Sequence, residues 1–290
     1  MPFTLPVRRE MTGRLSRLQQ TRRHVEDALV ALGLSEVYTP SLRPDDAHPD
    51  AIRLEEPITI ELAVLRTMLL PSLVEAARRN AEVGNDRVAL FELARTYLPR
   101  GEDLPEERLT VAGIVEGGFA TVKGIVEALL RSLHAPATWE PDEHLLFHPG
   151  KSARTETGVV GELHPAVLEG TWGGFELDLE ALAAAARIPV DYHDVITYPA
   201  VKQDLAFAVA EDVPAGALVD AARDAAGPEL REFEVFDVYR GDQVGPGRKS
   251  IAFRVEFQSP ERTLSDEDAA GLRARIVDAL RERFGAELRA

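Results

Sequence analysis

The sequence predicts an α+β protein, in which an antiparallel sheet with packed helices is followed by a ferredoxin-like βαββαβ domain. Two observations carry this prediction. In the earlier part of the chain, helical periodicity alternates with short extended runs bounded by glycine, and the residues after Pro199 follow the order strand, helix, strand, strand, helix, strand. The chain has 290 residues, of which 45% are hydrophobic and 28% are charged. This length and balance suit one large globular domain or two ordinary ones.

The earlier part of the chain contains three expected helices and several short strands. Leu18–Leu32 follows helical spacing and stops at Gly33. A second helix is expected over Leu69–Asn80, and Thr121 is expected to cap a third helix that reaches Leu133. The expected strands are Ser35–Thr39, Val88–Leu98, Leu109–Val115, Ser152–Glu156, Val159–Leu163 and Gly174–Asp178.

A connector is expected at Ile188–Pro199, which contains two prolines, and it separates a domain of residues 1–194 from one of residues 195–290. In the second domain, Ser265 and Asp268 have the spacing of a helix-capping box. The expected strands are Leu205–Val209, Phe233–Tyr239, Ser250–Phe257 and Ala286–Arg289, and the expected helices are Pro214–Ala226 and Ser265–Phe284. This order is the split βαββαβ unit of ferredoxin-like folds.

The composition excludes several classes of protein. The net charge of −16 argues against a surface coated with basic residues for nucleic acid. The chain has no cysteine, which excludes disulfides, thiolate zinc sites and a cysteine nucleophile. Apolar runs such as Leu179–Ala186 are far shorter than the roughly 20 residues that cross a bilayer. Met1–Glu10 has no secretory core, so we expect a soluble, cytoplasmic protein without a membrane part.

Two short motifs resemble ligand sites without meeting their requirements. Gly150-Lys151-Ser152 ends like a phosphate-binding loop, but Leu145 stands where that motif needs a glycine. His144 and His148 are four residues apart, which suits zinc on a helix, but they lie in turn sequence with no third ligand nearby. We expect structural or surface roles for these residues, and no metal site.

The third strand of the ferredoxin-like domain separates its side chains between two faces. The apolar residues of Ile251–Phe257 point to the core, whereas Ser250, Ala252 and Arg254 point away. The same alternation in the first strand places Ala206 on the outer face. Because both helices cover the core side, the outer face is predicted to be open and lined by small residues.

In the second strand of this domain, Phe236 and Val238 break the alternation. A β-bulge there would restore the core side and turn Asp237 and Tyr239 outward. Small residues leave room for a base, and an aspartate can accept hydrogen bonds from the N1–H and N2–H of an unpaired guanine. The cations expected to contact phosphates are Lys202, Arg240, Arg248 and Lys249 at the rim, and Arg254 on the face itself.

A solvated sheet face without a ligand explains the same pattern equally well. The strand Lys249–Phe257 also does not match an RNA-recognition motif. In that motif the position of Arg254 is apolar, and the strand carries outward aromatic residues that are missing here. Alternation alone therefore leaves the ligand of the open face undecided.

Several motifs carry a family resemblance. Phe236-Asp-Val-Tyr-Arg-Gly, Lys249-Ser-Ile-Ala-Phe and Arg262-Thr-Leu-Ser-Asp-Glu resemble the anticodon-binding domain that ends bacterial phenylalanyl-tRNA synthetase beta subunits, and Tyr198-Pro-Ala-Val-Lys-Gln-Asp-Leu-Ala resembles its entry. The earlier part resembles the preceding domains of that subunit, in the same order. Its motifs are Leu65-Arg-Thr-Met-Leu-Leu-Pro-Ser-Leu, Leu90-Phe-Glu-Leu-Ala-Arg, Phe147-His-Pro-Gly-Lys-Ser-Ala and Gly161-Glu-Leu-His-Pro. The resemblance covers essentially the whole chain.

The resemblance implies that the first domain has a class II aminoacyl-tRNA synthetase-like antiparallel sheet with a decayed catalytic site. Class II sites hold ATP with an arginine in a Phe-Arg-x-Glu strand, whereas this chain has Phe91-Glu92-Leu93-Ala94. The later glycine-rich strand, Gly173–Leu179, also lacks an arginine, and Met68, Leu69 and Leu70 replace polar residues. We expect no catalysis and no cofactor bound by this chain, because ATP and magnesium would be used by the alpha subunit.

The resemblance also implies partners: an alpha subunit, in an assembly of two alpha and two beta chains, and phenylalanine tRNA. By their motif positions, Ala206, Asp237 and Ser250 would lie at the first anticodon base, which is guanine. The family's amino-terminal tRNA-binding and editing domains have no counterpart here, so we expect no editing of mischarged tyrosine. Two alternatives remain: a single-chain synthetase-like enzyme, and a protein-interaction scaffold that binds no RNA.

Overall fold

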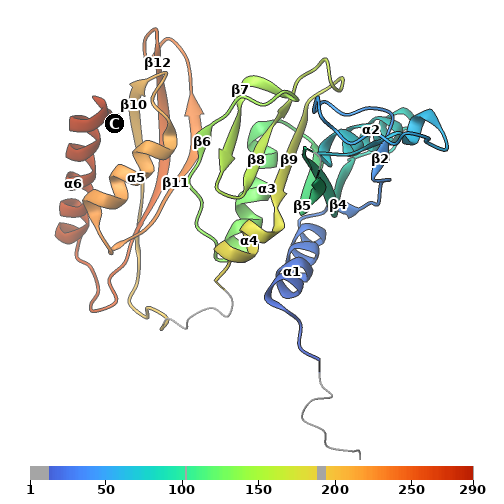
Figure 1. Cartoon of the computed structure of the whole chain (residues 1–290). Helices are drawn as coiled ribbons and strands as arrows, with labels where there is room; N and C mark the ends of the chain where they lie inside the picture. The colour runs from blue at the N-terminus through green and yellow to red at the C-terminus, as the bar shows by residue number, and fades with distance from the viewer. Residues whose placement is uncertain (1–12, 102, 188–193, 290) are drawn as a thin grey trace, which may run out of the picture. The chain divides into compact units, whose positions relative to one another are not determined.

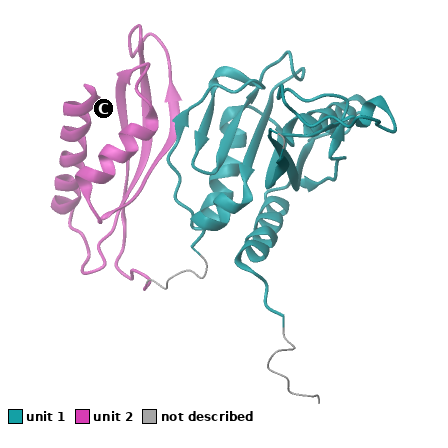
Figure 2. Cartoon of the chain, in the orientation of Figure 1, with its two compact units in different colours: residues 1–191 teal, residues 192–290 magenta. Residues whose placement is uncertain are grey.

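The computed structural model describes residues 13–101, 103–187 and 194–289. The chain divides into two compact units, Met1–Asp191 and Tyr192–Ala290 (Figure 2). The division falls three residues before the boundary expected from the prolines. Residues 188–193 of the expected connector Ile188–Pro199 lie outside the described residues, as does Met1–Glu10.

A seven-stranded sheet in the order β1-β4-β5-β9-β8-β7-β6 forms the centre of the first unit (Figure 1). Its strands are β1 (Ser35–Glu36), β4 (Ala89–Arg100), β5 (Asp103–Glu116), β6 (Glu140–Pro141), β7 (Phe147–Thr155), β8 (Gly158–Leu163) and β9 (Trp172–Asp178). All neighbours are antiparallel except β1 and β4, which are parallel, so the sheet is mixed rather than wholly antiparallel. Parallel neighbours need a crossover, and here the chain passes through α2 (Leu70–Glu82) before it enters β4.

Helices cover both faces of this sheet. The other helices of the unit are α1 (Arg17–Ala31), α3 (Phe119–Ser132) and α4 (Leu179–Ala185), and a small sheet of β2 (Leu42–Arg43) and β3 (Val64–Leu65) with the 3₁₀ turn η1 (Ile60–Leu62) precedes α2. Phe91 and Val111 belong to the core beneath α1, α3 and α4, whereas Leu90 and Ile114 belong to the core beneath α2. Because both faces are buried, β4 and β5 contain nearly continuous apolar runs.

The third helix begins differently from the prediction. Its N-cap is Gly118, which has no side chain to offer, and Thr121 lies inside the first turn. Glu162 of β8 supplies the missing acceptor, because its Oε2 accepts a hydrogen bond from Phe119 N at 3.2 Å. Lys151 pairs with Glu162 at 2.5 Å and holds the pKa of that carboxyl below its usual range. A carboxylate from a distant strand therefore replaces the local cap.

The second unit is a four-stranded antiparallel sheet in the order β11-β12-β10-β13, with both helices on one face (Figure 1). Its elements are β10 (Val201–Ala210), α5 (Ala215–Ala226), β11 (Leu230–Tyr239), β12 (Arg248–Phe257), α6 (Asp266–Phe284) and β13 (Glu287–Arg289). This order confirms the predicted βαββαβ unit. Its core joins Leu218 of α5 and Leu280 of α6 to Phe207 and Phe253 of the sheet.

The predicted capping box starts α6. Ser265 Oγ accepts a hydrogen bond from Asp268 N, and the Asp268 carboxylate accepts one from Ser265 N at 2.8 Å. Arg262 donates to the same carboxylate and holds the pKa of Asp268 far below its usual range. The helix ends at Gly285, whose φ of +61° is the left-handed conformation that glycine adopts without a steric penalty.

We expect Phe253→Ala to lower the free energy of unfolding by about 3–5 kcal/mol. Phe253 is fully buried, and its ring stacks on that of Phe233 with centroids 4.4 Å apart. Urea denaturation followed by far-UV circular dichroism measures the change. Val83→Ala, at a position 75% exposed, is the control and should change stability by less than about 0.5 kcal/mol. Equal stability of the two variants would contradict this packing.

Candidate nucleic-acid interface

The face of the second sheet that α5 and α6 leave uncovered has a floor of small side chains. Ala206 and Ala252 are direct partners on β10 and β12, and Ala208 and Ser250 form the next pair. On the opposite side of the same strands, Phe207 is fully buried. Ser250 is only 5% exposed, so its hydroxyl lies within the floor rather than above it. The two faces separate as the alternation predicted.

The predicted bulge is present in β11. Val235 pairs with Phe253, and Asp237 pairs with Ala252, so Phe236 is an extra residue between two pairs. Because an inserted residue reverses the alternation, Val238 after the bulge pairs with the buried Ile251 on the covered face, although Val238 itself is 40% exposed. Asp237 therefore lies on the open face, beside Ala252.

Two rows of cross-strand partners cross this open face. Ala206, Ala252 and Asp237 form one row, and Ser250 and Tyr239 belong to the next. The structure thus brings these five side chains together from three strands. Asp237 is exposed, and no described residue donates a hydrogen bond to its carboxylate. It can accept two donors from a ligand that rests on the alanine floor.

Four of the predicted phosphate contacts already have partners within the unit. The ion pairs are Lys202–Glu256 at 3.0 Å, Arg240–Glu211 at 2.8 Å and Arg248–Glu287 at 3.0 Å. Lys249 donates to the main-chain oxygen of Glu211 at 2.7 Å, so Arg240 and Lys249 gather at the end of β10. Exposed ion pairs contribute about 0.2–1 kcal/mol, so a phosphate can displace them, but they do not form an open basic patch.

Phe236 is a candidate site residue that sequence reasoning missed. It is 50% exposed, and the guanidinium of Arg254 lies 5.7 Å from the centre of its ring. The alternation of side chains did not assign Phe236 to either face of the sheet, because this residue lies where the alternation breaks. The bulge itself was the available signal, since Phe236 is the residue inserted at the shift in register between Val235 and Asp237.

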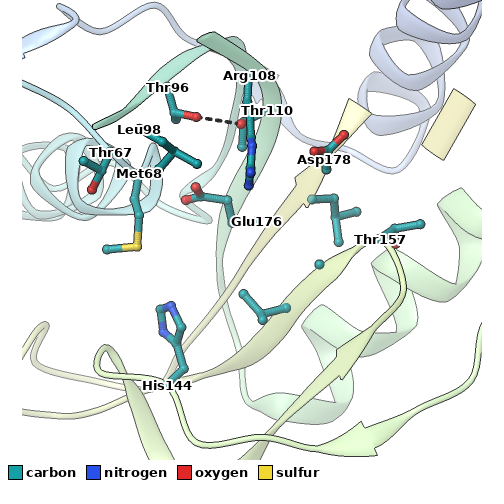
Figure 3. Close-up of a pocket in the computed structure, with 13 residues that line it drawn as sticks. Thr67, Met68, Thr96, Leu98, Arg108, Thr110, His144, Thr157, Glu176 and Asp178 are labelled. Carbon is teal, nitrogen blue, oxygen red and sulfur yellow. Dashed lines mark hydrogen bonds between the residues drawn. The ribbon is translucent and has the colours of Figure 1, made fainter. Parts of the chain in front are cut away.

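The first unit holds a pocket of about 230 Å³, lined by residues of β4, β5, β8, β9 and the segment before α2 (Figure 3). Met68 and Leu98 contribute apolar surface, and Thr96 and Thr110 bond to each other at 3.1 Å. Among the described lining residues, Arg108 is the one with a guanidinium, and it pairs with Glu106 at 2.5 Å. That is little free positive charge for a triphosphate.

A buried ion pair stands beside this pocket. Arg66 and Glu92 are each 1% exposed and lie 3.0 Å apart. Thr39 connects them, because its hydroxyl accepts from Arg66 at 2.8 Å and donates to Glu92 at 2.5 Å. Arg66 Nε also donates to the main-chain oxygen of Arg95 at 3.1 Å. This arginine therefore connects the segment before α2 to β4. Its positive charge is neutralised by Glu92 inside the fold.

Glu176 connects the pocket to the start of α2 (Figure 3). Its Oε2 accepts hydrogen bonds from Leu69 N at 3.0 Å and Leu70 N at 2.9 Å. Burial raises the pKa of the Glu176 carboxyl to about 7, and these two amide donors only partly oppose the shift. The carboxyl therefore titrates near neutral pH.

Three histidines of the first unit have ring neighbours. His144 packs on Phe147 with ring centroids 4.7 Å apart, and the rings of His148 and His164 lie 5.9 Å apart. The expected turn at Phe147–Gly150 is instead the irregular start of β7. Within the described ranges, no three His, Cys, Asp or Glu side chains gather as a metal site. No described helix has the length and apolar character to cross a membrane.

The families that match the two units define the class of protein as an aminoacyl-tRNA synthetase chain with an anticodon-binding domain. Residues 197–289 match the family described as "Ferredoxin-fold anticodon binding domain", and residues 1–186 match "Phenylalanyl tRNA synthetase beta chain CLM domain". The chain belongs to the phenylalanyl-tRNA synthetase beta chain family.

Its relatives are longer proteins. The phenylalanine–tRNA ligase beta subunit of Geobacillus kaustophilus is 36% identical, in a match that covers all of this chain and 40% of that protein. The subunit of Geobacter sulfurreducens is also 36% identical, over 99% of this chain and 40% of that protein. The subunit of Bacillus subtilis is 33% identical, over all of this chain and 40% of its own length. The chain thus spans about two fifths of these relatives.

We expect Glu176→Gln to reduce the dependence of stability on pH. The folded carboxyl keeps its proton up to about pH 7, whereas its ordinary pKa is 4.5. The folded state therefore holds more protons between these values, and the free energy of unfolding falls as the pH rises through them. At about 1.4 kcal/mol per pKa unit, the fall due to Glu176 is at most ~3.5 kcal/mol.

Urea denaturation of both proteins at a series of pH values from 4.5 to 8 measures this difference. Glu180→Gln changes an exposed carboxyl in the first turn of α4, and it should keep the wild-type pH profile. If Glu176→Gln shows the same fall in stability as the wild type, the carboxyl does not titrate in this range.

Proposed function

We propose that this chain serves as the carboxy-terminal part of a phenylalanine–tRNA ligase beta subunit, which binds the anticodon region of phenylalanine tRNA and pairs with a catalytic alpha subunit. One observation carries the RNA-binding role. The bulge in β11 turns the exposed Asp237 onto a floor made by Ala206 and Ala252. An unpaired base can lie on this floor while its edge faces a carboxylate.

The floor suits a guanine. The carboxylate of Asp237 can accept from both the N1–H and the N2–H of that base, and no other base presents this pair of donors on its Watson–Crick edge. Ser250 lies in the neighbouring row as a smaller polar group, with Tyr239 opposite it. Phosphates of the loop would contact the rim, where Arg248 and Lys202 would exchange carboxylate partners for phosphate oxygens.

The first unit would contribute assembly rather than chemistry. Arg66, which lies beside the pocket, is held by Glu92 inside the fold, and ATP and magnesium would be used by the alpha subunit. We place the complex in the cytoplasm, with two alpha and two beta chains.

Asp237→Ala should weaken binding of a phenylalanine tRNA anticodon stem-loop about 5- to 150-fold, the range expected for losing a bidentate base contact. The loss should be smaller for a loop with inosine in place of the first anticodon guanine, because inosine lacks the N2 amine. Fluorescence anisotropy at several salt concentrations measures both effects. The slope of log Kd against log salt should not change, since Asp237 contacts no phosphate.

Asp278→Ala is the matched control for this experiment, because Asp278 is an exposed aspartate on α6, which covers the opposite face of the sheet. It should bind the stem-loop like the wild type. Equal loss of binding in both variants would contradict a specific contact between Asp237 on the open face and the RNA.

The chain should co-elute with an alpha subunit in gel filtration. In the first unit, Ile58 is 95% exposed and Ile60 is 75% exposed. A partner surface that covered these apolar side chains would remove the unfavourable free energy of their contact with water. Ile58→Asp should lower the co-eluting fraction, whereas Leu145→Asp, at an apolar residue 63% exposed elsewhere in the unit, should not. Separate elution of the wild-type chain and alpha would refute the assembly role.

A further inference from the structure

The fold of β11 does not require an aromatic side chain at Phe236. It is the inserted residue of the bulge, between the pairs Val235–Phe253 and Asp237–Ala252. A smaller or polar residue could fill an insertion, because the inserted residue has no cross-strand partner to satisfy. Phe236 is nevertheless 50% exposed, while Phe253 is fully buried in the core.

Arg254 shows on which side the ring lies. Its alternate neighbours along β12, Ala252 and Glu256, pair on the open face, and its guanidinium lies 5.7 Å from the centre of the Phe236 ring. Phe236 therefore stands over the same face as Asp237. Consecutive residues of one strand, which ordinarily point to opposite faces, here share a face because of the bulge.

The guanidinium of Arg254 lies beside the Phe236 ring, although the cross-strand partners of Arg254 are carboxylates. Asp204 is its partner on β10 and Glu234 is its partner on β11. Within the described residues, no carboxylate oxygen lies within ion-pair distance of Arg254, in contrast to the cations of the rim. A planar guanidinium beside an exposed aromatic ring is an arrangement that accepts the flat face of a further ring.

We propose that Phe236 and Arg254 form a stacking site for a second unpaired nucleobase, adjacent to the base whose edge Asp237 would bind. This inference rests on the proposed anticodon role and adds to it a second nucleotide. The ligand class is an unpaired base in a single-stranded RNA loop, held by its face and therefore without strong preference for its identity.

The charges of the face support stacking as the main source of affinity. Asp204, Glu234 and Asp237 surround Arg254 in the strand register, and the rim cations are paired. A face of this kind offers little attraction to phosphates. Contacts to the faces and edges of bases depend weakly on salt, whereas phosphate contacts depend on it strongly.

The test uses the 290-residue chain and phenylalanine tRNA anticodon stem-loops that carry 2-aminopurine at one loop position at a time. Binding of the wild type should quench the fluorescence of the probe at one position beside the first anticodon base. Phe236→Leu keeps the apolar volume but removes the aromatic face. It should abolish this quenching and weaken binding about 5- to 150-fold, as for loss of one base–aromatic stack.

Two further variants separate stacking from folding and charge. Phe236→Trp should keep the affinity, and the fluorescence of the new tryptophan should be quenched by the unlabelled loop. Arg254→Lys keeps the charge but removes the planar group, so binding should weaken while the salt slope stays constant. Tyr38→Leu, at an aromatic residue 87% exposed in the first unit, is the control and should leave binding and quenching unchanged.

The outcomes distinguish this inference from the function on which it rests. If the wild type binds the loop but Phe236→Leu binds equally well with the same quenching, the stacking site is wrong and the anticodon role stands. An unquenched Phe236→Trp that binds normally leads to the same conclusion. If the wild type does not bind the loop at all, the anticodon role and the stacking site both fail.

Discussion

Both helices of the second unit pack on the same face of its four-stranded sheet, and the arrangement of its side chains depends on this constraint. The apolar side chains of β10 and β12 therefore share the covered side, where Phe207 and Phe253 are fully buried. The alternate positions remain free of packing demands and can carry alanine and serine. The bulge at Phe236 extends this division to β11, since it keeps Val235 on the covered side and places Asp237 on the open one.

The first unit solves the same problem differently, because helices cover both faces of its sheet. A pocket of about 230 Å³ and a buried polar network lie within this unit. Arg66 and Glu92 satisfy each other there, and removing one partner of such a pair costs about 3–5 kcal/mol. A buried arginine with these contacts stabilises the fold, and its charge is not available to a nucleotide.

The acidic character of the chain is compatible with recognition of RNA through bases. A net charge of −16 repels phosphates at long range, and Arg248 and Lys202 already pair with carboxylates. Stacking and hydrogen bonds to a base edge act at short range and require shape rather than excess positive charge.

The sequence by itself determined the βαββαβ order, the capping box of Ser265 and the bulge in β11, because alternation and capping depend on residues close together in the chain. Tertiary structure alone decided which groups meet across strands. Glu162, not Thr121, supports the start of α3, and Arg254 lies beside the ring of Phe236 rather than beside a carboxylate. These choices follow from competition among partners brought together by strand register, and local spacing carries no information about which partner wins.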